Sequence, residues 1–358
     1  MGTAPLSHTF WAGRRVFVTG HTGFKGGWLM ALLRQLGAEV AGYALAPPSE
    51  PNLFTAARVA GFGGSAIGDI RDAASLTAAM AAATPDIVLH LAAQALVRPA
   101  RAEPVDTFST NVVGTAQVLD AVRQTPSVKA CVVVTSDKVY DNVEWAWAYR
   151  ETDRLGGKEP YGASKACTEI VVEAYRASYF SGDGQPALAS ARAGNVIGGG
   201  DWAEDRLIPD AIRAFSTRET LMIRNPASVR PWQHVLEPLS GYLRLAEVLV
   251  DERSTLPQPF TFNFGPAQDD AVSVRVIADA ITARWGDGAR WDHDTRFQPY
   301  EARLLEVDSA KARAALGWRP QWRLGQALDQ TIAWYKAYYE GQDMQILTLR
   351  QIDEYLNG

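Results

Sequence analysis

The stretch Arg14-Arg-Val-Phe-Val-Thr-Gly-His-Thr-Gly23-Phe-Lys-Gly26 decides the fold. It begins as a short apolar run and passes through a glycine-rich turn into residues 27–34, whose apolar side chains recur at helical spacing. Glycines in such a turn let backbone N–H groups approach a pyrophosphate, and the helix N-terminus adds a partial positive charge. The stretch therefore predicts a strand, a dinucleotide-binding turn and a helix. A tight turn without a ligand is the alternative.

Further apolar runs with the composition of buried strands continue this pattern along the chain. They lie at residues 39–43, 65–68, 85–91, 131–134 and 260–264. Helical spacing is expected at 105–124, 274–285, 309–316 and 324–339. Strands that alternate with helices favour an α/β fold with a doubly wound parallel Rossmann sheet.

Composition excludes several classes of protein. The 358 residues carry a net charge of -5, and the 35 Lys and Arg residues are scattered, so neither nucleic acid nor an anionic membrane is an expected partner. Cys131 and Cys167 are the two cysteines, which indicates no disulfide framework and no metal site. No leader segment and no apolar run of about 20 residues are recognisable. We expect a soluble, cytoplasmic protein.

Reactive side chains gather between residues 135 and 165. Ser136, Asp137 and Lys138 follow an apolar strand directly, at the sheet edge where doubly wound folds bind ligands. Tyr161 and Lys165 are spaced i and i+4, so they share one face of a helix. A nearby ammonium and a positively charged nicotinamide would lower the pKa of Tyr161 and make it a base. After a glycine turn and a strand-end serine, this spacing indicates a dehydrogenase site.

The spacing Gly20-x-x-Gly23-x-x-Gly26 resembles the T-G-x-x-G-F-x-G motif of extended short-chain dehydrogenase/reductases. His21 and Lys25 are unusual in it, and they either reach the cofactor or are solvated. No acid follows the second strand before Glu50, so this position does not choose between NAD and NADP. The resemblance implies NAD, held by Gly20, His21, Thr22, Gly23, Phe24, Lys25, Gly26, Asp69, Ile70, Leu91, Ala92, Ala93, Asn111, Tyr161 and Lys165.

The sequence Ser136-Asp137-Lys138 indicates which enzymes of this superfamily the chain resembles. A simple reductase or epimerase needs the serine, tyrosine and lysine but no additional charged pair, whereas sugar nucleotide 4,6-dehydratases commonly carry Thr-Asp-Glu here. With the glycine turn, the chain resembles CDP-glucose 4,6-dehydratases over nearly its whole length. The further matching stretches are 141–157, 192–202, 205–210, 230–234 and 298–301.

The resemblance implies roles for the reactive side chains. Tyr161 would take the 4-hydroxyl proton, Ser136 would hydrogen-bond that oxygen, and Lys165 would hold the nicotinamide ribose. Asp137 would protonate the departing 6-hydroxyl. Lys138 either removes the proton at carbon 5 or stays charged and polarises the substrate, and we favour the base. Substrate contacts are expected from Gln94, Ser136, Asp137, Asn195, Arg206, Leu207, Arg230 and Tyr300.

The expected reaction converts CDP-glucose to CDP-4-dehydro-6-deoxyglucose and water. A nucleotide-sugar 4-epimerase and a non-catalytic nucleotide-sugar sensor are the alternatives. We expect an NAD-binding Rossmann domain and a smaller C-terminal substrate-binding lobe. The domain comprises residues 1–192 with returning segments near 233–264, and the lobe mainly 193–232 and 265–358. A homodimer or homotetramer is expected, because relatives associate through the helices around Val105 and Tyr161.

Overall fold

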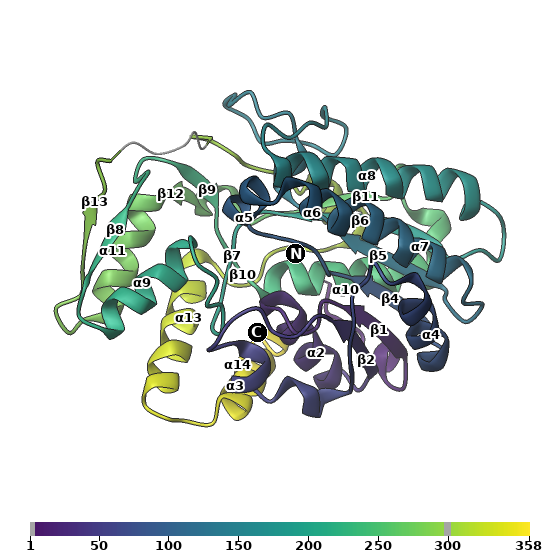
Figure 1. The fold of residues 1–358 in the computed structure, drawn as a ribbon, viewed down its shortest axis with the longest axis horizontal. Coiled ribbons are helices and arrows are strands. Elements are labelled where there is room, and N and C mark those ends of the chain that lie inside the picture. The colour runs from purple at the N-terminus through teal and green to yellow at the C-terminus, as the bar shows by residue number, and fades with distance from the viewer. Residues whose placement is uncertain (1–3, 297–301) are drawn as a thin grey trace.

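A parallel sheet forms the centre of the protein (Figure 1). The computed structural model describes residues 4–296 and 302–358, and within them seven strands lie in the order β3-β2-β1-β4-β5-β6-β11. Each neighbouring pair is parallel. The strands are β1 (Arg15–Thr19), β2 (Glu39–Ala44), β3 (Gly64–Ile67), β4 (Ile87–His90), β5 (Ala130–Val134), β6 (Ala187–Ala193) and β11 (Thr261–Phe264). The predicted doubly wound sheet is confirmed.

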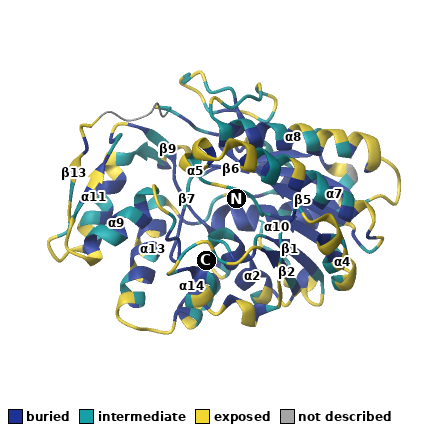
Figure 2. Ribbon diagram, viewed as in Figure 1, coloured by how far each residue is buried: buried dark blue, intermediate teal, exposed yellow. Residues whose placement is uncertain are grey.

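Both faces of the sheet are buried, because alternate side chains of a strand enter different cores. Val16 and Val18 of β1 join the core that includes residues of α2 (Phe24–Gln35) and α10 (Leu236–Asp251). Phe17, which lies between them, joins a second core. That core includes residues of α4 (Ala73–Ala83), α7 (Gly114–Arg123) and α8 (Pro160–Tyr179). In Figure 2 the inner strands of the sheet are buried, and exposed residues lie on the outer sides of the helices. The edge strand β3 is exposed.

The order of the strands reverses beside β1. From β1 the chain moves outward to β2 and β3, and then crosses to β4 on the other side of β1. In open parallel sheets such a reversal leaves a crevice outside the carboxyl ends of the strands, where ligands bind. The glycine turn after β1 lies at this reversal.

The helix expected at 105–124 is interrupted. Helix α6 (Pro104–Phe108) passes into a π-helical turn, η2 (Ser109–Val113), before α7 begins. Side chains provide hydrogen bonds to the carbonyl of Asn111 in this turn. The hydroxyls of Thr115 and Thr168 donate to it at 2.6 and 2.9 Å. The Thr168 hydroxyl comes from α8, so tertiary packing stabilises the turn.

A smaller part of the chain lies beyond the sheet, on the left of Figure 1. Its strands pair as β7 (Val196–Ile197) with β10 (Gln233–His234), β9 (Val229–Pro231) with β12 (Ala271–Ser273), and β8 (Thr220–Ile223) with β13 (Arg290–His293). The later helices are α9 (Leu207–Ser216), α11 (Val274–Trp285), α12 (Ala310–Leu316), α13 (Leu324–Tyr339) and α14 (Met344–Leu356). The remaining α-helices of the described residues are short: α1 (His8–Trp11), α3 (Leu53–Ala56) and α5 (Val97–Ala102).

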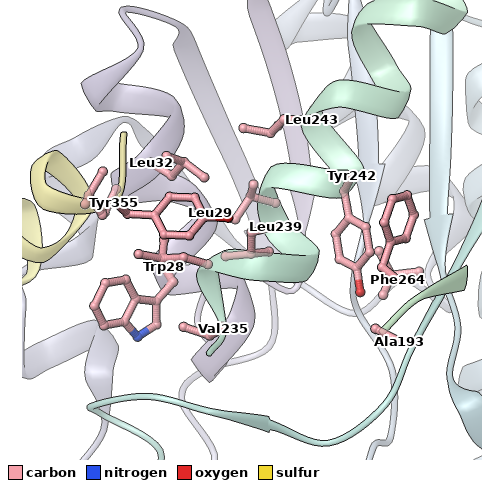
Figure 3. Packing of buried hydrophobic residues seen from close by; sticks show 14 of the residues in the cluster. Trp28, Leu29, Leu32, Ala193, Val235, Leu239, Tyr242, Leu243, Phe264 and Tyr355 are labelled. Atoms are coloured by element: carbon pink, nitrogen blue, oxygen red, sulfur yellow. The ribbon is translucent and has the colours of Figure 1, made fainter. Parts of the chain in front are cut away.

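The last helix, α14, packs on α2. Figure 3 shows Tyr355 of α14 close to Leu29 and Leu32 of α2. The Tyr355 hydroxyl donates to the buried carboxylate of Glu237 at 2.9 Å, which also accepts two backbone N–H groups, from residues 321 and 322. Glu237 thereby ties α10 to the C-terminal segment. Among residues 4–296 and 302–358, no helix is both long and apolar enough to span a membrane.

Glu237→Gln tests this connection through its pH dependence. Burial raises the pKa of Glu237 from its ordinary 4.5 to about 7. A raised folded-state pKa contributes stability that is complete below the unfolded pKa and is lost as the pH rises through the folded one. Across this window, the free energy of unfolding of the wild type should fall relative to the variant by at most about 1.4 kcal/mol per pH unit. Chemical denaturation measures it, and a difference independent of pH would contradict the raised pKa.

Candidate active site

A cavity of about 700 Å³ opens at the carboxyl ends of the central strands. Its lining comes from the glycine turn, the loops after β2 and β4, the end of β5, the first turns of α8, and the smaller part of the chain around α9 and β8. The cavity therefore lies between the sheet and the smaller part, at the reversal of strand order. This is the position that the doubly wound fold predicts for a ligand.

Backbone crowding requires glycine at two positions of the turn. Gly20 has a φ of +83°, and a Cβ there would lie 2.7 Å from the backbone nitrogen of Ala92. A Cβ on Gly26 would lie 2.1 Å from the carbonyl oxygen of Gly20. Helix α2 starts directly after Gly23, which provides no side-chain cap. Gly20, Gly23 and Gly26 line the cavity at the start of this helix, so its first N–H groups fit a dinucleotide pyrophosphate.

His21 and Lys25 have different environments. The His21 side chain is fully buried beside β2, where its Nε2 lies 2.6 Å from the Ser65 hydroxyl, and it does not line the cavity. Burial lowers the pKa of His21 to about 4. The His21 side chain therefore neither reaches the cavity nor is solvated, because it fills the space beside Gly42 of β2. Lys25 does line the cavity, and burial, followed by the charge of Arg206, lowers its pKa to about 7.

Asn111 supports the loop after β4. Its Oδ1 accepts from the backbone N–H of Gln94 at 2.8 Å, and its Nδ2 donates to the Gln94 carbonyl at 2.9 Å and to the Ser164 hydroxyl at 2.8 Å. The Gln94 side chain bonds to the backbone of Leu96. Neither Asn111 nor Gln94 lines the cavity. The geometry thus gives Asn111 a supporting position, and it offers no support for a substrate contact by the Gln94 side chain.

The end of β5 presents a serine, an acid and a lysine in contact with one another. The short 3-10 helix η3 (Asp137–Val139) turns Asp137 inward, where it is fully buried. Oδ1 of Asp137 accepts from the Ser136 hydroxyl at 3.1 Å and from Lys138 Nζ at 3.0 Å. Its Oδ2 has no hydrogen-bond partner in the described part of the chain. Ser136 and Lys138 line the cavity, and Asp137 lies directly behind them.

Helix α8 places Tyr161 and Lys165 beside this acid and lysine. The helix begins at Pro160, and the preceding Glu159 carboxylate accepts the N–H groups of Tyr161 and Gly162. One turn later, Lys165 Nζ donates to the Val134 carbonyl at 3.2 Å. Both side chains are buried and line the cavity.

The protein's own groups leave the pKa of Tyr161 raised, because burial outweighs the opposing charge of Lys138 and the hydrogen bond from Ser136. Of the charges within the protein, that of Lys138 does most to lower the pKa of Tyr161. Burial lowers the pKa of Lys165 itself to about 8, and the carboxylate of Glu169 opposes that shift.

The opposite wall carries four of the eight predicted substrate residues. Asn195, Arg206, Leu207 and Arg230 all line the cavity. Arg206 precedes the first turn of α9, and its guanidinium pairs with Asp201 at 2.8 Å. The remaining predicted contact, Tyr300, lies outside the described residues.

Sequence reasoning missed an ion pair between the two walls. Arg98 of α5 pairs with Asp205 at 2.9 Å, and Arg224 of the smaller part reaches the same carboxylate at 3.0 Å. All three line the cavity. No local motif marks them, because the partners are far apart in the chain. Glu159 was also missed, although an acid before Pro160 is a helix-start signal that could have identified it.

The sequence matches the GDP-mannose 4,6 dehydratase family over residues 17–331. The chain belongs to this family. A CDP-glucose 4,6-dehydratase of Salmonella typhimurium is 48% identical over 361 residues, covering 99% of both chains. A dTDP-glucose 4,6-dehydratase of Xanthomonas campestris is 28% identical, covering 75% of this chain and 77% of that protein. The predicted resemblance to sugar nucleotide dehydratases is confirmed, and the chain is an enzyme of this type.

Solved structures agree on the fold. The dTDP-glucose 4,6-dehydratase of Bacillus anthracis in complex with NAD has a TM-score of 0.75 at 20% identity, covering 92% of this chain and 99% of that one. The UDP-glucose-4-epimerase of Stenotrophomonas maltophila with bound NAD has a TM-score of 0.78 at 22% identity, with the same coverage. At these identities the likeness concerns the fold and does not separate dehydratase from epimerase.

Gly26→Ala tests the backbone crowding at the turn. Its Cβ would meet the Gly20 carbonyl at 2.1 Å, so the turn must distort. We expect a lower melting temperature together with loss of NAD binding in isothermal titration calorimetry. Gly23→Ala is the folding control, because its Cβ would meet that same oxygen at an ordinary 3.4 Å. Native stability and native NAD affinity in Gly26→Ala would show that the turn is not constrained.

Proposed function

We propose that the enzyme converts CDP-glucose to CDP-4-dehydro-6-deoxyglucose and water with NAD as its catalytic cofactor. The choice of nucleotide rests on the 48% identity to a CDP-glucose 4,6-dehydratase across 99% of the chain. The observation that carries the reaction type is the contact between Lys138 and the buried Asp137, because a 4-epimerase has no use for this pair.

The residues around the glycine turn fit the cofactor. Gly20 and Gly26 remove side chains from its path, the start of α2 offers N–H groups, and Lys165 reaches the same cavity from α8. Asp69, Ile70, Leu91, Ala92 and Ala93 line the cavity wall nearby, as predicted for the adenosine and nicotinamide ribose. When bound, NAD accepts a hydride from the sugar, returns it later, and supplies a positive charge near Tyr161.

Tyr161 and Ser136 are proposed to act at carbon 4. The Ser136 hydroxyl hydrogen-bonds the Tyr161 phenol, so both groups can contact one sugar oxygen. Tyr161 takes the proton of the 4-hydroxyl as carbon 4 is oxidised to the ketone. The Lys165 ammonium, one helical turn from Tyr161 in the same buried region, is proposed to favour the phenolate form.

Asp137 and Lys138 are proposed to remove water across carbons 5 and 6. Lys138, as a free amine, takes the proton from carbon 5, while protonated Asp137 gives its proton to the departing 6-hydroxyl. The step leaves an ammonium beside a carboxylate. As the hydride returns to carbon 6, the Lys138 ammonium gives a proton to carbon 5. Asp137 regains its proton from Tyr161, which holds the proton of the 4-hydroxyl, through the Ser136 hydroxyl that lies between them.

We also propose the domain division and self-association predicted from the sequence. The proposed NAD-binding domain comprises residues 1–192 and 233–264, and the proposed lobe mainly 193–232 and 265–358. Residues 193–232 supply most of the opposite cavity wall, to which the later segment adds Val274, Ala302 and Leu305. Helix α14 is an exception, because it packs on α2. Apolar side chains exposed on α6, η2 and α8, namely Val105, Val113 and Ile170, support association through these helices.

A substrate panel tests the proposed reaction. The purified enzyme is incubated with CDP-, dTDP-, GDP- and UDP-glucose, with and without added NAD. Mass spectrometry should show loss of one water from CDP-glucose in preference to the others. A product of unchanged mass with inverted carbon 4 would establish an epimerase, and binding without turnover would establish a sensor.

Lys138→Ala tests the base. Removal of a general base typically costs about 100- to 10,000-fold in rate, so we expect a loss of this order. The measurement is entry of solvent deuterium at carbon 5 of the product in D₂O, followed by mass spectrometry. An undiminished rate of deuterium entry in the variant would rule out the base role and favour a charged Lys138 that polarises the substrate.

A further inference from the structure

Helix α8 docks on the end of β5 through three side chains spaced one helical turn apart. Tyr161 hydrogen-bonds the Ser136 hydroxyl, and Lys165 Nζ donates to the Val134 carbonyl. The third, Glu169, accepts from the hydroxyl of Thr135 at 2.5 Å. Residues i, i+4 and i+8 of one helix face thus hold three consecutive residues at the strand end. The proposed chemistry uses Tyr161 and Lys165, but it does not explain Glu169.

Glu169 is a buried carboxylate whose two oxygens are both occupied. Oε1 accepts from Thr135, while Oε2 accepts from the Ser190 hydroxyl at 2.7 Å and from Arg192 Nη2 at 3.0 Å. Side-chain exposures of 3% for Glu169 and 4% for Arg192 make the ion pair a desolvated one. Burial alone would raise the pKa of Glu169, but the Arg192 charge and these hydrogen bonds lower it, so the carboxylate is ionised.

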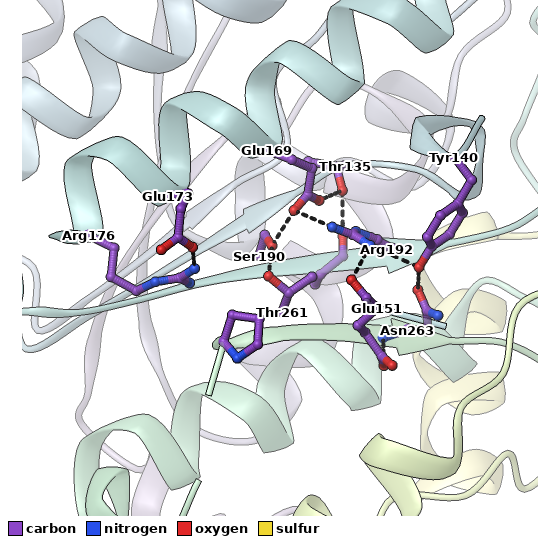
Figure 4. A network of polar contacts seen from close by, with 12 residues as sticks. Thr135, Tyr140, Glu151, Glu169, Glu173, Arg176, Ser190, Arg192, Thr261 and Asn263 are labelled. Carbon is purple, nitrogen blue, oxygen red and sulfur yellow. Dashed lines mark hydrogen bonds and ion pairs between the residues drawn. The ribbon is translucent and has the colours of Figure 1, made fainter. Parts of the chain in front are cut away.

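Arg192 extends the network to the other side of the catalytic residues. Its Nη1 donates to the Tyr140 hydroxyl at 2.9 Å, and that hydroxyl donates to Asn263 Oδ1 at 2.8 Å (Figure 4). Thr135 immediately precedes residues 136–138, and Tyr140 lies just beyond them. The ion pair therefore fixes both ends of the segment that carries Ser136, Asp137 and Lys138.

A buried ion pair by itself contributes little to the stability of a fold. Well-packed apolar residues often replace such pairs without loss of stability, whereas removal of one partner leaves an expensive unpaired charge. Here the pair joins α8, β5 and β6, and through Tyr140 it reaches β11. What it specifies is the register between the helix that carries Tyr161 and the strand end that carries Ser136.

Glu169 is also the acidic residue one turn after Lys165 on the same face of α8. Glu169 opposes the effect of burial on the pKa of Lys165, which lies at about 8. The other titratable groups that interact with Lys165 are Lys25 of α2 and His90 of β4, and neither brings a negative charge.

We propose that Glu169, paired with Arg192, is a positioning residue for the dehydration. It holds the segment 135–140 in register with α8 and keeps Lys165 in its ammonium form. The inference rests on the proposed reaction, since it concerns the geometry that this reaction needs.

The test compares Glu169→Gln with two further variants. Glu169→Gln keeps the size and an acceptor oxygen but removes the charge. Thr135→Val removes only the hydroxyl that joins β5 to Glu169, and it leaves the ion pair intact. The matched control is Glu173→Gln, one turn further along α8, where an exposed carboxylate pairs with Arg176. Measurements are kcat and KM for CDP-glucose over a range of pH, and the melting temperature of each protein.

We expect kcat of Glu169→Gln to fall by about 100-fold with little change in KM, because misplacement by about 1 Å costs this much. The alkaline limb of its pH profile should move about one unit lower, since Lys165 loses its opposing charge. Thr135→Val should lower kcat on the order of tenfold at an unchanged alkaline limb. Glu173→Gln should keep the wild-type kcat and pH profile, because its exposed carboxylate does not line the cavity.

Wild-type kcat and pH profiles in Glu169→Gln and Thr135→Val, with altered melting temperatures only, would overturn the inference and leave the proposed reaction intact. Where Glu169→Gln fails to fold, the kcat of Thr135→Val decides. Absence of CDP-glucose turnover in the wild type would overturn the proposed reaction and this inference together.

Discussion

The docking of α8 against the carboxyl end of β5 is the contact on which the active site depends. It places a phenol and an ammonium from the helix beside a hydroxyl, a carboxylate and an amine from the strand end. These five groups come from two segments of the chain, so their geometry is only as accurate as the register between helix and strand. Hydrogen bonds at three successive turns of one helix face fix that register more tightly than apolar packing alone.

A second constraint acts through the backbone. The turn after β1 passes so close to the loop after β4 that a side chain at Gly20 would collide with Ala92. The same closeness brings the start of α2 to the edge of the sheet, where a dinucleotide can reach its N–H groups. On the other wall, α9 and the arginines of the smaller part face this edge across the cavity. Cofactor and sugar nucleotide can therefore meet over residues 136–138.

The sequence predicted the features that depend on local pattern. The bounds of α11 and α13 were predicted to the residue. Apolar periodicity and capping residues determine such elements without help from distant parts of the chain. The reactive groups at residues 136–138, 161 and 165 were likewise recognisable from spacing and resemblance, and the structure gathers them around one cavity.

What the sequence did not predict depends on partners distant in the chain. The π-helical turn at Asn111 is stabilised by Thr168 from another helix, and the inward orientation of His21 depends on the space left by Gly42. Glu169 resembles any charged residue in an amphipathic helix until Arg192 is placed beside it. The ion pair of Arg98 with Asp205 is of the same kind. Local pattern thus predicts the reactive groups, whereas tertiary packing determines how they are held.

The central claim is that this site carries out an internal oxidation, elimination and reduction on one sugar. The most direct measurement starts from CDP-glucose that carries deuterium at carbon 4 and locates the deuterium in the product by NMR. The account predicts deuterium at carbon 6 of a 4-keto product in the same molecule. Deuterium that remains at carbon 4 of an epimerised sugar, or that is lost to solvent, would contradict it.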